Sequence, residues 1–342
     1  HSLSYCIDIY RRKFEPVHNL RDYLLYVGFF PQLVAGPIVR WSEMREQIET
    51  PRRMSATTIG MGVALMIVGL FEKVVLADSV FAPVADAYFN SAQSSSGAEA
   101  WVGALAFSGQ IFCDFAGYTT CALGAALVLG FRLPINFLNP YAALGFSDFW
   151  RRWHISLSTW LRDYVYIGLG GNRRGRWFTY RNLMLTMLLG GLWHGAAWTF
   201  VVWGGLHGSL LIIERLIKNR LPHPIRLAWP LALLGKLATF AAIVITWVWF
   251  RSPDVASAWA SSWQMLAFTS WVGAPVALSG AQQLVLLAMG LLLAGQLCFN
   301  NRSLPEVLAK IPAPLLGLLL GLLAAMIMLS PGESHAFIYF QF

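Results

Sequence analysis

A histidine in the middle of an uncharged apolar stretch is the residue of this sequence best suited to acid–base chemistry. Residues 183–213 contain no Asp, Glu, Lys or Arg, and their centre reads Gly-Gly-Leu-Trp-His-Gly-Ala-Ala-Trp, residues 190–198. About 20 apolar residues cross the hydrocarbon core of a bilayer, so this stretch can lie within one. An imidazole at that depth needs a partner or a water-filled cavity, because an unpaired polar group in hydrocarbon costs several kcal/mol. We therefore take His194 as the first functional candidate. The alternative is a packing residue bonded to a neighbouring carbonyl.

A second Trp-His element lies in residues 146–171, and His154 is its candidate for chemistry. Ser147 is placed to cap a helix here. At about 100° per residue, one face of that helix collects aromatic and apolar residues together with the histidine: Trp150, His154, Leu157, Ser158 and Leu161. Arg152, Ser156 and Thr159 point the other way. We expect an amphipathic helix along the cytoplasmic membrane surface, with His154 on its buried face. A histidine that only packs remains equally open.

Weaker signals come from two further polar residues in apolar runs. Asp114 is the single charge of residues 101–131, and Tyr118 follows it by one helical turn. The carboxylate could orient an imidazole or a substrate hydroxyl, or make a structural hydrogen bond. His207 lies about 140° around a continuous helix from His194, so the two could ligate one metal only if the helix breaks. We interpret His207 as structural.

The remaining motifs, present and absent, narrow the classes of enzyme that the sequence supports. Residues 170–176 contain three glycines and three arginines, which could hold a phosphate-bearing donor such as coenzyme A, although a solvated basic loop explains them as well. No Walker loop, GxSxG or HExxH occurs, so the sequence supports no nucleotide hydrolase, serine-hydrolase elbow or zincin. The four cysteines form no CxxC pattern, and we expect small buried residues without a disulfide framework or metal site.

Composition places these elements in a membrane. Of 342 residues, 57% are hydrophobic and only 12% charged, with a mean hydropathy of +0.55. Soluble domains carry about 25% charged residues, so the class expected is an all-α, polytopic membrane protein. The net charge of +8 fits basic cytoplasmic loops facing an anionic leaflet better than nucleic-acid binding.

The distribution of charge gives an expected topology. Residues 57–77 should span, 78–100 should form an outward loop without Lys or Arg, and 101–131 should return. Residues 132–182 are rich in Arg and should be cytoplasmic. Basic segments flank 183–213 on both sides, which favours a re-entrant hairpin or a discontinuous helix broken near its glycines. Further spans are expected at 227–250, 281–298 and 312–329, whereas 23–39, broken by Pro31, Gly36 and Pro37, should be re-entrant or interfacial.

At these residues the sequence resembles the membrane-bound O-acyltransferase family, and within it the bacterial branch typified by alginate O-acetylation. The resemblance is carried by Phe149-Trp-Arg-Arg-Trp-His-Ile-Ser-Leu-Ser-Thr-Trp160, Gly170-Gly-Asn-Arg173 and Gly191-Leu-Trp-His-Gly-Ala-Ala-Trp198. Phe30-Pro-Gln-Leu-Val-Ala-Gly-Pro-Ile38, Asp114-Phe-Ala-Gly-Tyr118 and the closing Phe337–Phe342 support it. Gly168 stands where relatives usually have proline. The likeness begins inside the family's pattern, so we expect residues 1–342 to be one membrane domain that lacks several N-terminal helices.

The resemblance implies spanning, re-entrant and interfacial helices around a central funnel, with His194 at the near-invariant histidine and His154 at the second conserved polar position. We expect these two residues to be catalytic, with His194 as the base, since burial favours the neutral imidazole that a base requires. Substrate contacts are expected from a further set: Asp114, Tyr118, Trp150, Arg151 and Trp193.

The expected function is transfer of an acyl group, foremost acetyl, from a cytoplasmic thioester across the membrane towards hydroxyls of an exported polysaccharide such as alginate. The location implied is the bacterial inner membrane. Acetyl-CoA is expected as the donor, with no bound cofactor and no metal. The partners implied are the lipid bilayer and periplasmic O-acetylation proteins, without nucleic acid. D-alanyl transfer to teichoic acid, a passive acyl conduit and a scaffold subunit remain alternatives.

Overall fold

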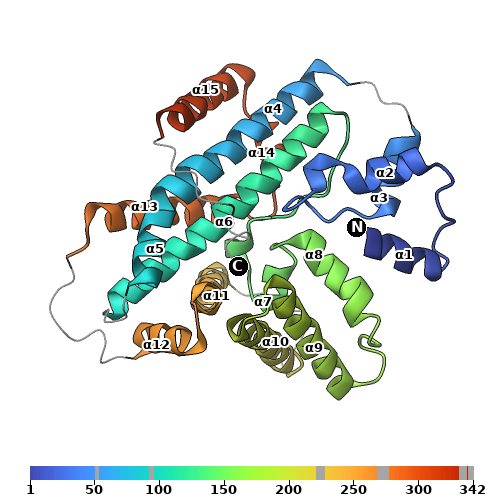
Figure 1. The fold of residues 1–342 in the computed structure, drawn as a ribbon. Coiled ribbons are helices and arrows are strands. Elements are labelled where there is room, and N and C mark those ends of the chain that lie inside the picture. The colour runs from blue at the N-terminus through green and yellow to red at the C-terminus, as the bar shows by residue number, and fades with distance from the viewer. Residues whose placement is uncertain (51–53, 92–95, 221–227, 268–276, 331–336, 338–342) are drawn as a thin grey trace.

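The protein is built from helices arranged around one long central helix (Figure 1). The structure is a computed structural model and describes residues 1–50, 54–91, 96–220, 228–267, 277–330 and 337. No strand occurs within those ranges. Five helices are long and apolar enough to cross a membrane. The expected all-α, polytopic class is therefore confirmed.

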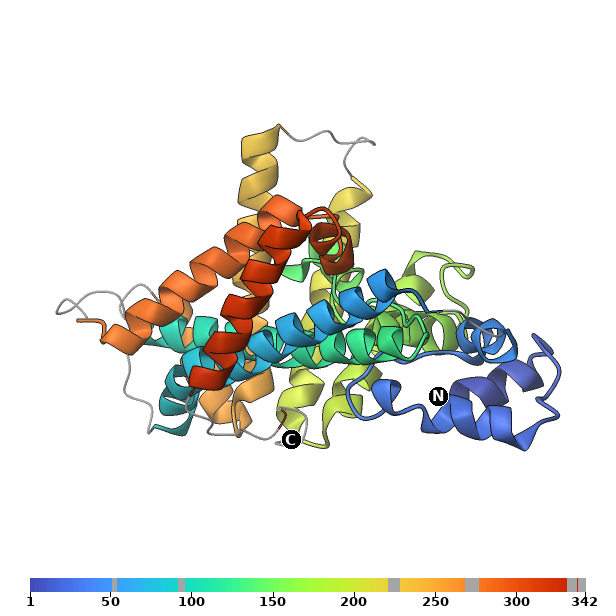
Figure 2. The ribbon, with the colours of Figure 1, turned by 90° about the horizontal axis from the view of Figure 1, so that it is seen from above.

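The N-terminal part begins with short helices: α1 (Ser2–Tyr10), α2 (Leu20–Gly28), the 3-10 turn η1 (Phe30–Gln32) and α3 (Trp41–Glu49). They gather at one edge of the molecule in both Figure 1 and Figure 2. Their core is aromatic, with Tyr26 and Trp41 packed edge to face at 5.3 Å between ring centroids. None of them is among the five candidate spans, in line with the interfacial character expected for residues 23–39.

The next segment differs from the expected topology. A continuous helix runs from Ala56 to Asn90 through α4 (Ala56–Leu70), the π-helical segment η2 (Phe71–Phe81) and α5 (Ala82–Asn90). The prediction that residues 78–100 form a loop is therefore wrong for 78–90, and also for 97–100, which begin the next helix. Charges at Glu72, Lys73 and Asp78 suggested an end to the span, but Lys73 lies 2.7 Å from Asp78 within the helix, so these charges are compatible with continuing it.

The central helix α6 (Gly97–Val128) starts at a capping box, in which Ser96 and Glu99 bond to each other's backbone. Glycines let α4 approach it closely. A Cβ atom at Gly69 would lie 2.5 Å from the carbonyl oxygen of Gly117, and one at Gly124 would lie 2.5 Å from that of Gly62. Small residues at such crossings allow backbones to pack together, which is how spanning helices associate in lipid.

The rest of the chain surrounds α6. The helices that follow it are η3 (Pro140–Ala142), α7 (Phe146–Trp150), α8 (Ile155–Trp160), η4 (Leu161–Tyr166), α9 (Arg176–His194), α10 (Trp198–Lys218), α11 (Trp229–Arg251), α12 (Val255–Leu266), α13 (Gly280–Phe299), α14 (Leu304–Leu308) and α15 (Ala313–Leu329). Spans expected near 227–250 and 281–298 correspond to α11 and α13. Helix α15, with 17 residues, is shorter than the five candidate spans.

Two smaller expectations also meet the structure. Of the four cysteines, only Cys113 is buried; Cys121 is half-buried, and Cys6 and Cys298 are exposed. The prediction that all four are buried is therefore wrong for Cys6, Cys121 and Cys298. Cys298 lies at the end of a helix whose residues mostly face outward, and apolar surface facing lipid can accommodate a thiol. Most of the closing Phe337–Phe342 lies outside the described residues; Phe337 itself packs 5.0 Å from Tyr118.

Candidate active site

His194 is the last residue of α9, at the point where a helical hairpin breaks. Residues 195–197 are non-helical, and α10 then begins at Trp198. The expected discontinuous helix is therefore present, although α9 starts at Arg176, inside the stretch predicted to be a cytoplasmic segment. Glycines hold the two arms together, since a Cβ atom at Gly191 would lie 2.2 Å from the carbonyl oxygen of Phe200.

The ring of His194 lies in an aromatic setting. Its centroid is 5.2 Å from that of Trp203 on α10 and 5.1 Å from that of Phe250 on α11, both edge to face. His194 is half-buried, and the preceding Trp193 is 53% exposed. The imidazole therefore lies at the border between the packed core and the accessible surface around the break.

His154 is buried, as expected, but the reason given for it is wrong. The predicted continuous helix over 146–171 is divided into α7, α8 and η4, and His154 occupies the break with a left-handed backbone, φ +43°. Gly145, not Ser147, precedes the first turn. Arg152 and Ser156, predicted on the solvent side, are 8% and 5% exposed, because the break turns both inward.

Asn136 holds this break in place. Its side-chain oxygen accepts hydrogen bonds from the backbone nitrogen of Ser156 at 3.2 Å and from Ser156 Oγ at 2.9 Å, and it lies 3.2 Å from His154 Nδ1. Its backbone oxygen accepts from Ile155. A left-handed conformation is uncommon for a residue other than glycine, and such residues cluster at functional sites when the surroundings impose them. Asn136 was missed because nothing in the sequence around Pro134–Phe137 indicates its role.

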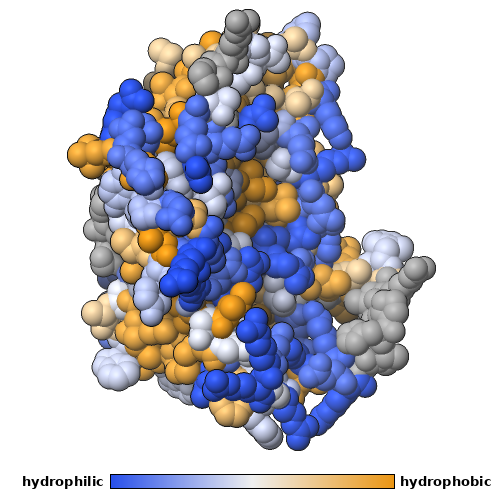
Figure 3. Space-filling model, turned by 90° about the vertical axis from the view of Figure 1, so that its right-hand side faces the viewer, coloured by the Kyte–Doolittle hydropathy of each residue, from blue (hydrophilic) through white to orange (hydrophobic). Residues whose placement is uncertain are grey.

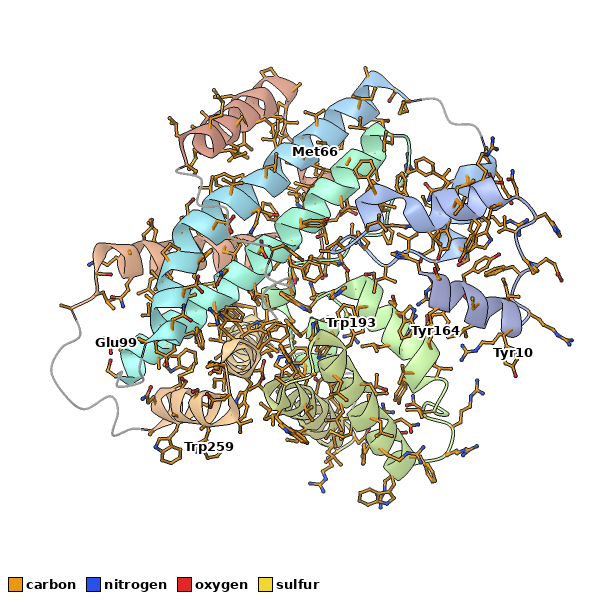
Figure 4. The ribbon with its side chains drawn as sticks, viewed as in Figure 1. Tyr10, Met66, Glu99, Tyr164, Trp193 and Trp259 are labelled. Carbon is orange, nitrogen blue, oxygen red and sulfur yellow. The ribbon has the colours of Figure 1, made fainter. Side chains whose placement is uncertain are left out.

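Both candidate histidines lie against the same indole. The Trp193 ring lies 6.1 Å from the ring of His154 and 4.9 Å from that of His194. The ring of Phe115 on α6 also packs edge to face against the His154 ring, with 4.7 Å between the two centroids. Figure 4 shows Trp193 near the centre of the molecule. Burial lowers the pKa of His154 well below its ordinary value, and the neighbouring His194 lowers it further. The site therefore presents a neutral imidazole next to a second one.

Trp150 and His207 form a separate pair beside this site. Trp150 Nε1 donates to His207 Nδ1 at 3.2 Å, and the His207 side chain is fully buried on α10. Trp203 links this pair to His194, since its ring lies 4.8 Å from that of His207. In the residues that the structure describes, no group of three or more His, Cys, Asp or Glu is arranged to hold a metal ion.

The other expected contact residues lie apart from the imidazoles. Asp114 pairs with Lys73 of η2 at 2.6 Å rather than with a histidine. Tyr118 packs against Phe337, and Arg151 bonds to Ser147 Oγ and Asp148 at the surface.

A hydrophilic surface lies on the side of the molecule where the N-terminal helices are (Figure 3). Figure 3, which faces these helices, shows a broad band of hydrophilic residues next to apolar patches. Arg40 pairs with Asp163 of η4 at 2.7 Å, and its guanidinium lies 5.2 Å from the Tyr164 ring. This ion pair, also missed from the sequence, ties residues 29–40 to the segment that continues α8. The loop at 170–176 turns through three positive-φ glycines: Gly170, Gly171 and Gly175.

Comparison with known proteins agrees with the geometry. The profile of MBOAT, the membrane-bound O-acyltransferase family, matches residues 10–252. A protein of Azotobacter vinelandii named "Probable alginate O-acetylase AlgI" is 44% identical over 79% of this chain and 52% of its own length. The peptidoglycan O-acetyltransferase of Helicobacter pylori is 45% identical over 72% of this chain and 46% of its own.

A more distant relative is the teichoic acid D-alanyltransferase of Bacillus subtilis, 30% identical over 57% of this chain and 51% of its own length. The chain thus spans about half the length of the curated relatives it matches. The profile covers well over half of the sequence, including both histidine elements. The chain belongs to the membrane-bound O-acyltransferase family.

Proposed function

We propose that this protein is a multi-pass O-acyltransferase of the bacterial inner membrane, which passes an acetyl group from a cytoplasmic thioester, acetyl-CoA, to hydroxyls of an exported polysaccharide. The observation that carries the proposal is the pair His154 and His194, whose rings both lie against Trp193. Relatives named for acetylation of alginate and of peptidoglycan match with 44% and 45% identity, against 30% for the D-alanyltransferase, which favours acetyl and a glycan.

His194 is the base in this proposal. The acceptor hydroxyl oxygen attacks the thioester carbonyl carbon while its proton moves to the imidazole. The carbon–sulfur bond then breaks, and the thiolate leaves and takes that proton, giving an ester and a free thiol. One imidazole can serve both transfers because its ordinary pKa lies near neutrality. Its place at the break of the hairpin, half-buried beside an exposed Trp193, supports access by both substrates.

His154 is the second catalytic imidazole, with the role of orienting the acceptor hydroxyl. Trp193 belongs to the substrate-contact set together with Trp150 and Arg151. Asp114 and Tyr118 complete that set as the more remote members, on the α6 side. The loop at 170–176, which contains Arg173 and Arg174, suits the phosphates of a coenzyme A donor, since guanidinium groups bind phosphate in bidentate geometry. Acceptor transfer is proposed to involve periplasmic partner proteins.

The test uses the full-length protein in lipid nanodiscs with acetyl-CoA labelled in the acetyl group. The expected result is cleavage of the thioester by the wild type and loss of about 100-fold or more with His194→Ala, the range of general acid–base catalysis. Retained cleavage in a folded His194→Ala variant would remove the base. A wild type that never cleaves the thioester would favour a passive conduit or a scaffold. Cleavage only of a D-alanyl thioester would instead move the chain to the teichoic acid class.

A further inference from the structure

The hydrogen-bond pattern around Asn136 determines which ring nitrogen of His154 carries a proton. The backbone N–H of Ser156 can only donate, so the side-chain atom of Asn136 that it contacts at 3.2 Å must be the oxygen. That oxygen can only accept, and it also lies 3.2 Å from His154 Nδ1. Nδ1 therefore carries the proton. A neutral imidazole in this form has its lone pair on Nε2.

The direction of the hydrogen bonds of the Ser156 hydroxyl is fixed as well. Its oxygen accepts from the backbone nitrogen of Ile38 at 2.9 Å, so its proton goes to Asn136. Asn136 is 1% exposed and His154 is 3% exposed, so water does not compete for these bonds. Within the described residues, this oxygen is the hydrogen-bond partner of the His154 ring. The amide oxygen thus contacts the His154 ring at one atom, Nδ1, and bonds to Ser156 besides.

The opposite arrangement occurs on α10. There Trp150 Nε1, which can only donate, contacts His207 Nδ1, so the proton of His207 is on Nε2. The two histidines near His194 are therefore protonated on different ring nitrogens: Nε2 of His207 is a hydrogen-bond donor, and Nε2 of His154 is an acceptor. A proton acceptor is what a substrate hydroxyl needs from its neighbour.

We propose that Asn136 is a positioning residue that holds His154 with Nδ1 protonated, so that Nε2 accepts a hydrogen bond from a hydroxyl of the acceptor glycan next to the one whose proton His194 takes. This inference rests on the proposed acyl transfer. Its logic is that of a histidine whose tautomer is fixed by a third group, which keeps the reactive nitrogen unprotonated. Asn136 does not touch substrate; it acts through His154.

The tautomer can be measured without any activity. Full-length protein in nanodiscs is labelled with ¹⁵N-histidine, and the His154 signals are assigned by their loss in His154→Gln. The expected spectrum has a protonated Nδ1 and an unprotonated Nε2. Asn136→Asp should keep that form, because a carboxylate oxygen also accepts from Nδ1. Asn136→Ala should shift His154 towards the Nε2-protonated form or a mixture. A wild-type ring protonated on Nε2 would overturn the proposal.

The functional arm measures coenzyme A release from acetyl-CoA between pH 5.5 and 9. Asn136→Ala should lower the rate about 10- to 100-fold, the usual effect of losing a partner that orients a reactive side chain. Asn136→Asp should stay active at high pH, but the acid limb of its profile should move to higher pH. The reason is that a carboxylate stabilises the imidazolium, so the acceptor form appears only above a raised pKa.

The ionisable neighbour of His154 is His194 on α9, whereas α6 presents Phe115 and the preceding loop presents Asn136. Arg152 is engaged by Asp148 and Asn301. Ser156→Ala is the matched control, because it removes a bond to Asn136 without touching the ring. It should leave the pH profile unchanged and the rate within about 3-fold.

Equal losses in Ser156→Ala and Asn136→Ala, or an unmoved acid limb in Asn136→Asp, would reduce Asn136 to a packing residue. Absence of thioester cleavage by the wild type would instead contradict the proposed function. In that case the nitrogen spectra still decide whether Asn136 sets the His154 ring.

Discussion

Trp150 Nε1 lies 3.2 Å from His207 Nδ1, and this bond joins the short helix α7 to the fully buried His207 side chain of helix α10. Trp150→Phe removes the donor and leaves an imidazole acceptor without a partner. We expect this variant to lose about 1–3 kcal/mol of stability, the penalty for a buried unsatisfied polar group. Thermal unfolding in detergent would measure it.

The double variant Trp150→Phe/His207→Leu is the informative control for that loss. Replacing both partners by apolar groups removes the unsatisfied atom, so the second substitution should cost less in the Trp150→Phe background than in the wild type. Additive losses would show that the two side chains contribute only through packing.

The contact between α4 and α6 predicts a different kind of sensitivity. A Cβ atom at Gly69 would meet backbone and sulfur atoms of α6 within 2.5–2.7 Å, whereas one at Gly60 on the same helix meets nothing within 4 Å. Gly69→Ala should therefore destabilise the protein by about 1–3 kcal/mol through overpacking. Gly60→Ala should be neutral or stabilise by up to about 1 kcal/mol, because alanine favours a helix. Melting temperatures of the two purified variants would compare them, and equal shifts would contradict the close crossing.

Lys73 bridges two carboxylates, at 2.7 Å to Asp78 and 2.6 Å to Asp114. Lys73→Met should be among the most damaging changes in α6 and its neighbours, with a loss of about 3–5 kcal/mol, because it leaves negative charge in a buried setting. The measurement is the yield of monodisperse protein after solubilisation. Lys73→Met/Asp114→Asn should recover part of the loss. Failure of this rescue would argue that Asp114 has a role beyond its ion pair.

Asp163 supplies a prediction about pH. Burial raises the pKa of its carboxyl, but hydrogen bonds from Arg162 and Arg40 outweigh this effect and hold the pKa below its ordinary value of 3.8. A lowered folded-state pKa means that the stabilisation is present above the ordinary value and is lost as the pH falls through the folded-state value. The stability difference between wild type and Asp163→Asn should thus be largest near pH 7 and shrink below about pH 4. Chemical unfolding at both pH values would reveal a constant difference if the ion pair contributes nothing.

The sequence was sufficient for the class of fold and for a break near the glycines of residues 183–213, because apolar length and glycine content report directly on membrane helices. It was insufficient where side chains from distant segments decide the structure. His154 was predicted to be buried on a continuous helix; it is buried, but by a backbone turn that Asn136 stabilises from 18 residues upstream. The carboxylate of Asp114 likewise found Lys73, 41 residues away, and no periodicity records that choice. Local patterns therefore predicted the candidate histidines and missed the groups that position them.

Trp193 gives the most direct test of the paired imidazoles. Its indole lies against both His154 and His194, yet it is 53% exposed, so its removal should not damage the core. We expect Trp193→Ala to fold normally and to lose about 10-fold or more in acyl transfer, since a substrate wall and the spacing of the two rings are lost together. Trp193→Phe keeps an aromatic face and should retain most activity. Trp177→Ala is the matched control, because this tryptophan of the same helix is 71% exposed and lies at the opposite end of α9. Its activity should equal that of the wild type in the labelled acetyl-CoA assay. A Trp193→Ala variant as active as Trp177→Ala would mean that the Trp193 indole, which lies against both histidines, has no part in the reaction.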